Sequence, residues 1–114
     1  MQEISETPVF TLSFNLLKDI YLLRKKFPKT EKYTLGGQME QTALEIMLSI
    51  IQAGRAKKQE KIIPLELAIK KNDTTKILFR LAKEIKLISD QQYLEYQEKL
   101  QKIGQMLGGW YRSI

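Results

Sequence analysis

The sequence predicts an all-α protein, folded as an antiparallel, up-down-up-down four-helix bundle. Apolar residues recur at helical spacing through four long segments. Only six glycines and three prolines are present, too few for the tight turns of a β-sandwich or barrel. The links between the segments are short, which makes consecutive helices antiparallel neighbours. With 114 residues, the chain is expected to form one domain over residues 1–114, of which residues 1–8 are a loosely ordered N-terminal segment.

The first helix is expected over residues 9–27. Thr7 is a suitable N-cap, and Pro8 occupies a position where a first helical turn tolerates proline. Pro28 ends the helix, because the residue before a proline is pushed out of the helical conformation. The apolar residues cover more than one face. One stripe consists of Phe10, Phe14, Leu17 and Tyr21, and it is widened by Leu12, Leu16, Ile20 and Leu23.

The second helix is expected over residues 34–57, with Thr34 as its N-cap. Its apolar residues lie on two sides. One side carries Leu35, Met39, Ala43, Ile46, Ile50 and Ala53, and the other carries Leu44, Met47, Leu48 and Ile51. A helix that is apolar on two sides must be covered twice. It is either a deeply buried central helix or a helix that also contacts another subunit.

The third helix is expected over residues 62–88, with Pro64 in its first turn. The weak helix formers at residues 72–74 predict an irregularity in this helix. Beyond them, Leu78, Leu81, Ile85 and Ile88 keep a three-four-three spacing. We expect the first three of these residues to anchor the helix in the core.

The fourth helix opens at Ser89, and Gln92 three residues later completes the pattern of a capping box. Apolar residues then alternate steps of three and four, which is the spacing of a bundle seam. The seam consists of Tyr93, Tyr96, Leu100, Ile103, Leu107 and Trp110. We expect Trp110 and Tyr111 to cover the end of the bundle rather than to bind a base.

Composition argues against most catalytic and metal chemistry. Cysteine and histidine are absent, which removes disulfides, zinc sites with thiolate or imidazole ligands, and catalytic triads. The sequence contains no glycine-rich loop of the phosphate-binding kind. We therefore expect no enzyme activity, cofactor, metal or small-molecule substrate. Because no apolar run reaches the roughly 18–20 residues of a membrane span and the N-terminus does not resemble a signal peptide, we expect a cytoplasmic protein without a membrane partner.

The net charge of +6 is concentrated in the middle of the chain, because residues 18–86 hold 16 Lys or Arg against 8 Asp or Glu. The most regular group is Lys76, Arg80 and Lys83, whose spacing of four and three places them on one helical stripe. Such a stripe follows phosphate groups and binds them in a salt-dependent way. The alternative is an ordinary solvated helix face. The candidate nucleic-acid-binding residues are Lys76, Arg80, Lys83, Lys86, Arg24, Lys25, Lys26 and Arg55.

Four strings of residues, taken in order, resemble one protein family. They are Lys-Phe-Pro-Lys-x-Glu-Lys-Tyr-Thr-Leu-Gly at 26–36, Gln-Thr-Ala-Leu-Glu-Ile at 41–46, Arg-Leu-Ala-Lys-Glu-Ile at 80–85 and Ile-Gly-Gln-Met-Leu-Gly-Gly-Trp at 103–110. The chain resembles the four-helix-bundle family of the accessory variability determinant (Avd) of diversity-generating retroelements. The same superfamily contains proteins encoded in intervening sequences of bacterial 23S ribosomal RNA genes.

The resemblance implies a non-enzymatic bundle that assembles as a homopentamer with a basic surface. It also implies two partners, the reverse transcriptase of the retroelement and its template RNA or an RNA/DNA hybrid, and a role in mutagenic cDNA synthesis. The candidate residues given above would then contact the nucleic acid or the polymerase. The alternative is an interaction protein of the intervening-sequence type, with the same fold and no nucleic-acid partner. The excess of basic residues favours the retroelement branch.

Overall fold

The computed structural model describes residues 3–114, and this part of the chain is helical apart from its turns. Four long helices form the body of the molecule: α1 (Pro8–Arg24), α3 (Leu35–Arg55), α4 (Ile62–Glu84) and α5 (Asp90–Arg112). Three short pieces accompany them: the helix α2 (Lys29–Lys32) and the 3-10 turns η1 (Ile4–Glu6) and η2 (Lys58–Lys61). The predicted all-helical class, with four long helices, is confirmed.

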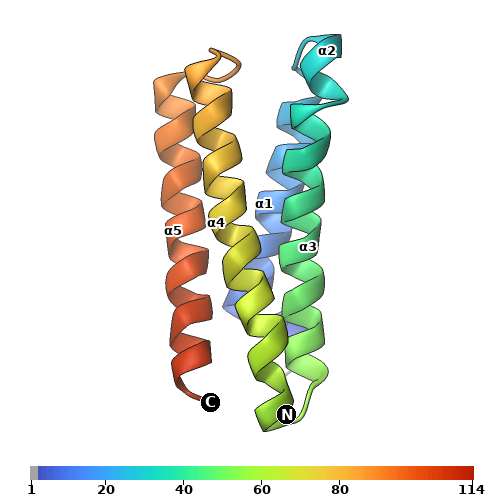
Figure 1. The fold of residues 1–114 in the computed structure, drawn as a ribbon, viewed down its shortest axis with the longest axis vertical. Helices are drawn as coiled ribbons and strands as arrows, with labels where there is room; N and C mark the ends of the chain where they lie inside the picture. Colours follow the sequence, from blue (N-terminus) through green and yellow to red (C-terminus); the bar gives the residue numbers. More distant parts are fainter. Residues whose placement is uncertain (1–2) are drawn as a thin grey trace.

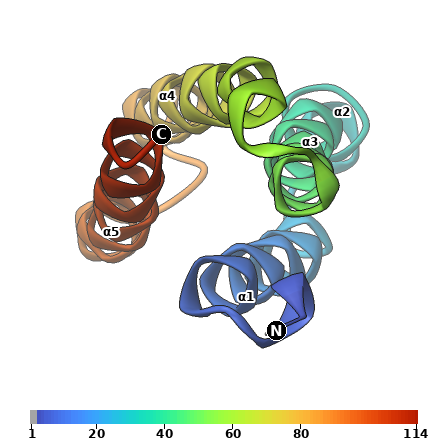
Figure 2. The same cartoon turned by 90° about the horizontal axis from the view of Figure 1, so that it is seen from below.

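The long helices lie along a body of 43 × 21 × 20 Å. Figure 1 shows that consecutive long helices are joined at alternate ends, so that α2 and the α4–α5 connection share one end, which we call the α2 end. Seen along the long axis, α3 lies between α1 and α4, and α5 lies beyond α4 (Figure 2). The contact between α1 and α5 is the smallest among neighbouring long helices, so the bundle is least closed along this side.

Each long helix contributes one buried stripe to the core. On α3 and α5 these stripes match the sequence prediction, and they consist of Met39, Ala43, Ile46, Ile50 and Ala53, and of Tyr96, Leu100, Ile103 and Leu107. The predicted caps of α1 and α5 are confirmed as well. The Thr7 hydroxyl accepts a hydrogen bond from the Phe10 backbone N–H at 3.4 Å, and Ser89 and Gln92 form the reciprocal capping box.

The buried faces of α1 and α4 differ from the prediction. Leu81 and Ile85 were expected to anchor α4, but they are 46% and 48% exposed. On α1, Phe14 and Tyr21 are about equally exposed. The core stripes are instead Val9, Ser13, Leu16, Ile20 and Leu23 on α1, and Leu65, Ala68, Asn72, Thr75, Phe79 and Ala82 on α4. On α1 the predicted residues Leu16, Ile20 and Leu23 are therefore buried as expected, and the core face is displaced toward them from Phe14 and Tyr21. Polar residues occupy core positions in both stripes, so apolar spacing alone does not centre either stripe correctly.

The expected irregularity at residues 72–74 is absent, and α4 runs through them without a break. Asn72 is 1% exposed, and its Nδ2 donates a hydrogen bond to the Leu100 carbonyl of α5 at 2.9 Å. The hydroxyl of Thr75 lies 3.0 Å from the hydroxyl of Thr42 on α3. Tertiary contacts to two neighbouring helices therefore offset the weak helix propensity of this stretch.

The third long helix ends at Glu84, earlier than the predicted residue 88. Lys86 adopts a φ of 64°, in the left-handed region. The backbone N–H of Leu87 then donates to the Ala82 carbonyl at 2.8 Å, and that of Lys86 donates to the Lys83 carbonyl at 3.0 Å. These are the two hydrogen bonds of a Schellman motif, which terminates the helix.

The link between the first two long helices contains α2, which the apolar spacing of the sequence does not predict. The first long helix accordingly ends at Arg24 rather than at residue 27. The next long helix begins and ends within two residues of its predicted bounds. Thr34 lies at its N-cap position without capping it, because its hydroxyl donates to the Thr30 carbonyl at 2.8 Å.

The N-terminal segment can be described from residue 3 onward, and residues 1–2 lie outside the described part. Ile4, in η1, packs against the core and lies directly over Gly54 of α3, where an added Cβ would come within 2.7 Å of the Ile4 side chain. The single domain over residues 1–114 and the loose order of residues 1–8 remain predictions.

Candidate nucleic-acid interface

The positive charge of the chain gathers at the α2 end. Residues 24–34 and 80–90 lie there, because α1 and α4 both finish at this end (Figure 1), and they hold eight Lys or Arg against three Asp or Glu. The middle portions of the four long helices, residues 9–23, 35–54, 67–79 and 91–107, hold six basic and six acidic residues. The opposite end, residues 3–8, 55–66 and 108–114, holds five basic and four acidic residues. The bundle is therefore electrically polarised along its long axis.

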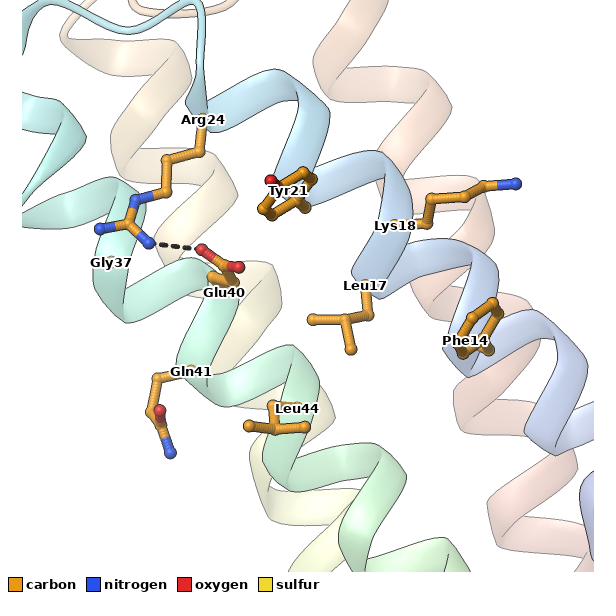
Figure 3. Close-up of a pocket in the computed structure, with 9 residues that line it drawn as sticks. All are labelled: Phe14, Leu17, Lys18, Tyr21, Arg24, Gly37, Glu40, Gln41 and Leu44. Carbon is orange, nitrogen blue, oxygen red and sulfur yellow. Dashed lines mark hydrogen bonds and ion pairs between the residues drawn. The ribbon is translucent and has the colours of Figure 1, made fainter.

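Arg24 is one of the predicted binding residues, but its guanidinium already has protein partners. Its Nε donates a hydrogen bond to the Lys32 carbonyl at 2.6 Å, and its Nη1 forms an ion pair with the Glu40 carboxylate (Figure 3). Its stem lies against Gly36, at the start of α3. Arg24 thus ties α1, α2 and α3 together, and it contributes less free charge than its position suggests.

Aromatic rings accompany the cations near Arg24. The Lys25 ammonium lies 4.5 Å from the centre of the Tyr21 ring. Arg24 Cζ and Lys32 Nζ each lie 5.9 Å from the centre of the Tyr33 ring. Lys26 is exposed. Cations held beside aromatic rings form an arrangement that accepts both the phosphates and the bases of a nucleic acid.

The predicted stripe on α4 lies along the seam between α4 and α5. Lys83 places its ammonium 4.9 Å from the centre of the Tyr93 ring of α5. Lys76 lies 3.9 Å from the Asp73 carboxylate, and its carbonyl accepts a hydrogen bond from the Gln97 side chain of α5 at 3.2 Å. The Lys83 ammonium is therefore positioned by α5, whereas the Lys76 ammonium faces an acid of its own helix.

The remaining predicted residues differ in their positions. Arg80, on the same helix, is exposed, and it forms no ion pair with Glu84 or with any other described acid. Lys86 is exposed at the turn that ends α4. Arg55 is the last residue of α3 and lies at the opposite end of the bundle (Figure 1). Lys76 lies about two helical turns before the end of α4, and Arg55 is separated from the other candidates. The structure thus brings six of the eight candidates to one end: Arg24, Lys25, Lys26, Arg80, Lys83 and Lys86.

Two apolar surfaces accompany the charges. A groove of about 450 Å³ runs between α1 and α3 and ends at the Arg24–Glu40 pair. Figure 3 shows Leu17 and Tyr21 of α1 and Leu44 of α3 facing this space. The outer face of α4 carries a ridge of exposed side chains, which we call the α4 ridge: Ile63, Leu67, Ile77, Leu81 and Ile85. Exposed apolar surfaces of this kind mark contacts with other molecules.

Other kinds of site find little support in the described part of the chain. Within residues 3–114, no three acidic side chains come together in a way that could hold a metal ion. None of the helices there has the length and apolar content of a membrane span.

Sequence reasoning missed two residues of this interface, Glu40 and Tyr33. Glu40 is the partner of Arg24 although sixteen residues separate them, and only the path of the chain through α2 brings them together. Tyr33 stands in one of the strings that carry the family resemblance. Its position in a basic, proline-containing link was the available signal that it is exposed.

Comparison with known proteins gives one result. No match was found among curated proteins or among solved structures. The model of the bAvd-like family matches residues 13–114, which is most of the chain and includes all four long helices, the first of them in part. By its sequence over this range and by its all-helical structure, the chain belongs to the bAvd-like family.

Proposed function

We propose that the protein is a non-enzymatic accessory subunit of a diversity-generating retroelement, acting in the cytoplasm. In this role it binds the reverse transcriptase and the template RNA, or an RNA/DNA hybrid, and supports mutagenic cDNA synthesis. Membership of the bAvd-like family supports the accessory role. The observation that carries nucleic-acid binding is the excess of eight basic over three acidic residues at the α2 end.

The chemistry of this end suits a phosphate backbone. Each phosphate that a Lys or Arg neutralises releases counterions, which gives affinity without dependence on base sequence. The long helices carry no evident set of side chains for reading base edges in a groove, so we expect weak sequence selectivity. On an antiparallel, up-down-up-down bundle, the ends of α1 and α4 present their cations together.

Assembly into a ring would repeat this basic end around an axis. A closed ring needs two different, complementary surfaces on each subunit. The α1–α3 groove and the α4 ridge are two such surfaces, one concave and one convex. We propose that they meet between neighbouring copies in a homopentamer, through the part of the ridge from Ile63 to Ile77, so that Leu81 stays open at the α2 end. Each basic site is then multiplied by the number of subunits. Light scattering that gives a monomer mass at micromolar concentration would refute this assembly.

The proposed binding is tested by the salt dependence of RNA affinity. Affinity should fall by orders of magnitude between about 50 and 200 mM salt if several phosphates are contacted. A variant with Lys76→Ala, Arg80→Ala and Lys83→Ala should lose binding to RNA or to the reverse transcriptase. Its fold and assembly should remain, because Arg80 is exposed and the half-buried Lys76 and Lys83 have one weak charge or ring contact each, so that each substitution costs about 1 kcal/mol or less.

A matched control removes the same charge from the opposite end of the bundle, through Lys57→Ala, Lys58→Ala and Arg112→Ala. This control should retain most of the RNA affinity. If both triple variants lose affinity equally, only net charge matters and the assigned site is wrong. If the first variant is folded and binds as the unmodified protein does, its three cations form an ordinary solvated face.

A further inference from the structure

Tyr33 is an exposed aromatic side chain at the α2 end. It is 65% exposed, the largest fraction of any aromatic residue in the described range 3–114. It stands at the C-cap of α2, at a turn rather than on a face of the bundle. A tyrosine that serves the core is far less exposed, as Tyr96 is at 8%. Most of Tyr33 is therefore accessible to a ligand, with the Arg24 and Lys32 cations each 5.9 Å from the ring centre.

The turn that carries Tyr33 is fixed by hydrogen bonds on both sides of the residue. Before it, the Lys32 carbonyl accepts from Arg24 Nε at 2.6 Å, and the Lys32 N–H donates to the Pro28 carbonyl at 2.8 Å. After it, the Thr34 N–H donates to the Glu31 carbonyl at 3.3 Å. A backbone ordered in advance loses little conformational freedom when a ligand binds.

The ring borders a groove of about 530 Å³ between the start of α3 and the last turns of α4. This volume falls within the roughly 300–1,000 Å³ that ligand sites occupy. The groove is lined by Tyr33, Thr34, Leu35, Gln38, Leu78 and Leu81. Its leucines form apolar walls, while the Gln38 amide carries both a donor and an acceptor. That combination matches the edge of an unpaired base.

The charges around the ring indicate which kind of ligand fits. Arg24 and Lys32 lie at 5.9 Å from the ring centre, and Lys25 and Lys29 are exposed on the adjoining turns. A nucleotide uses both features, because its base stacks on the ring and its phosphates meet the cations. A peptide carboxylate would meet the cations but would leave the ring without a planar partner.

We propose that the Tyr33 groove binds one unpaired base of a single-stranded nucleic acid. The base stacks on the Tyr33 ring, and the flanking phosphates contact Lys29 and Lys32. A base within a duplex is already stacked on its neighbours, so this site favours single strands over duplexes of the same sequence. The inference rests on the proposed nucleic-acid-binding function and adds to it the form of nucleic acid that is recognised.

The experiment measures the affinity of the full chain for a short single-stranded RNA, the corresponding DNA strand and the RNA duplex by fluorescence anisotropy. Tyr33→Ala should weaken single-strand binding between about five-fold and 150-fold, which corresponds to the roughly 1–3 kcal/mol of one base stacked on an aromatic ring. Tyr33→Phe should bind as the unmodified protein does. Tyr111→Ala removes an exposed tyrosine from the opposite end and should have no effect.

Two further readouts separate stacking from charge. In a plot of the logarithm of affinity against the logarithm of salt concentration, Lys32→Ala should reduce the steepness by about one unit, which corresponds to one lost phosphate contact. Tyr33→Ala should leave this slope unchanged. A 2-aminopurine base in the strand should change its emission on binding to the unmodified protein and to Tyr33→Phe, but not on binding to Tyr33→Ala. Duplex affinity should not respond to Tyr33→Ala.

The outcomes distinguish this inference from the proposed function. If the unmodified protein binds RNA in a salt-dependent way while Tyr33→Ala, shown to be folded by circular dichroism, binds single strands equally well, the stacking site is refuted and the general function stands. Equal loss of single-strand and duplex affinity in Tyr33→Ala also refutes it. If the unmodified protein binds none of the three nucleic acids at low salt, the proposed function fails and the inference fails with it.

Discussion

Gly36 lies where α1, α2 and α3 pack closely, and Gly36→Ala tests this packing. The residue is buried in the first turn of α3, beneath the stem of Arg24. An added Cβ would lie 2.8 Å from Arg24 Cγ, 3.2 Å from Phe27 Cδ2 and 3.2 Å from the Glu31 carbonyl oxygen. The carbonyl belongs to the backbone of α2, so it cannot move aside without displacing the turn.

The magnitude follows from two opposing effects. Forcing an extra methyl group into a well-packed site costs about 1–3 kcal/mol. Replacing glycine by alanine in a helix contributes up to about 1 kcal/mol, and less in the first turn, where few intrahelical hydrogen bonds have formed. We therefore expect Gly36→Ala to lower the free energy of unfolding by about 1–2 kcal/mol.

Gly109→Ala is the matched control, because no atom lies within 4 Å of the Cβ position at Gly109. The same substitution should there raise the free energy of unfolding by about 0.5 kcal/mol through helix propensity alone, less than in a helix interior because Gly109 lies in the last turn of α5. Urea denaturation followed by far-ultraviolet circular dichroism measures both variants. Protein concentration must be held constant, since assembly would add to the apparent stability. If Gly36→Ala proves as stabilising as Gly109→Ala, the close packing of α1, α2 and α3 around Gly36 is wrong.

Three further predictions concern the core and its margins. Arg24→Ala should lower the free energy of unfolding by about 1–3 kcal/mol, because it removes charged hydrogen bonds at a half-buried site. Lys26→Ala, on the exposed adjacent turn, should change the free energy of unfolding by about 0.5 kcal/mol or less. Urea denaturation of the two variants compares these effects. Phe79→Ala should cost about 3–5 kcal/mol, because Phe79 is fully buried and its ring stacks on that of Tyr96 at 4.3 Å; the midpoint of thermal unfolding shows the loss. Burial, followed by the nearby charge of Asp19, raises the pKa of Tyr96 from 10.0 to about 12. Between pH 10 and 12 the unfolded chain releases the Tyr96 proton while the folded chain keeps it. The stability of the protein relative to Tyr96→Phe should therefore be constant below pH 10 and fall by roughly 2–3 kcal/mol as the pH approaches 12. A stability difference that does not change with pH would contradict the assignment.

The parts of the fold that could be predicted from the sequence are those determined by local chemistry. The capping box of Ser89 and Gln92 depends on residues three apart, and it forms as the sequence indicates. The seam of α5 is an unbroken apolar pattern, and its central residues are all buried. On α4 the core stripe passes through Asn72 and Thr75, whose partners lie on other helices. Apolar spacing alone therefore places Leu81 and Ile85 in the core, where the structure leaves them exposed.

The candidate site was predictable in its charge but not in its geometry. The sequence identifies the basic clusters, and the path of the chain brings those around Arg24 and Lys83 to one end (Figure 1). Pairing between Arg24 and Glu40 depends on the turn through α2, which is too short to carry a periodic signal. The exposure of Tyr33 follows from the same turn.

The α2 turn carries cations and also presents Tyr33, and this double role constrains how binding at the α2 end is tested. Arg24 is counted among the cations of the α2 end, but its guanidinium neutralises Glu40 and holds the Lys32 carbonyl. Removing Arg24 would therefore release the turn that presents Tyr33, and a loss of RNA affinity in that variant would not distinguish a lost phosphate contact from a displaced ring. Lys26 is exposed on the adjacent turn, and Lys32→Ala leaves in place the backbone carbonyl that Arg24 holds. Substitutions of these lysines remove charge while the turn remains held, so the number of phosphates contacted at this end is best measured from the lysines, with Arg24 left intact.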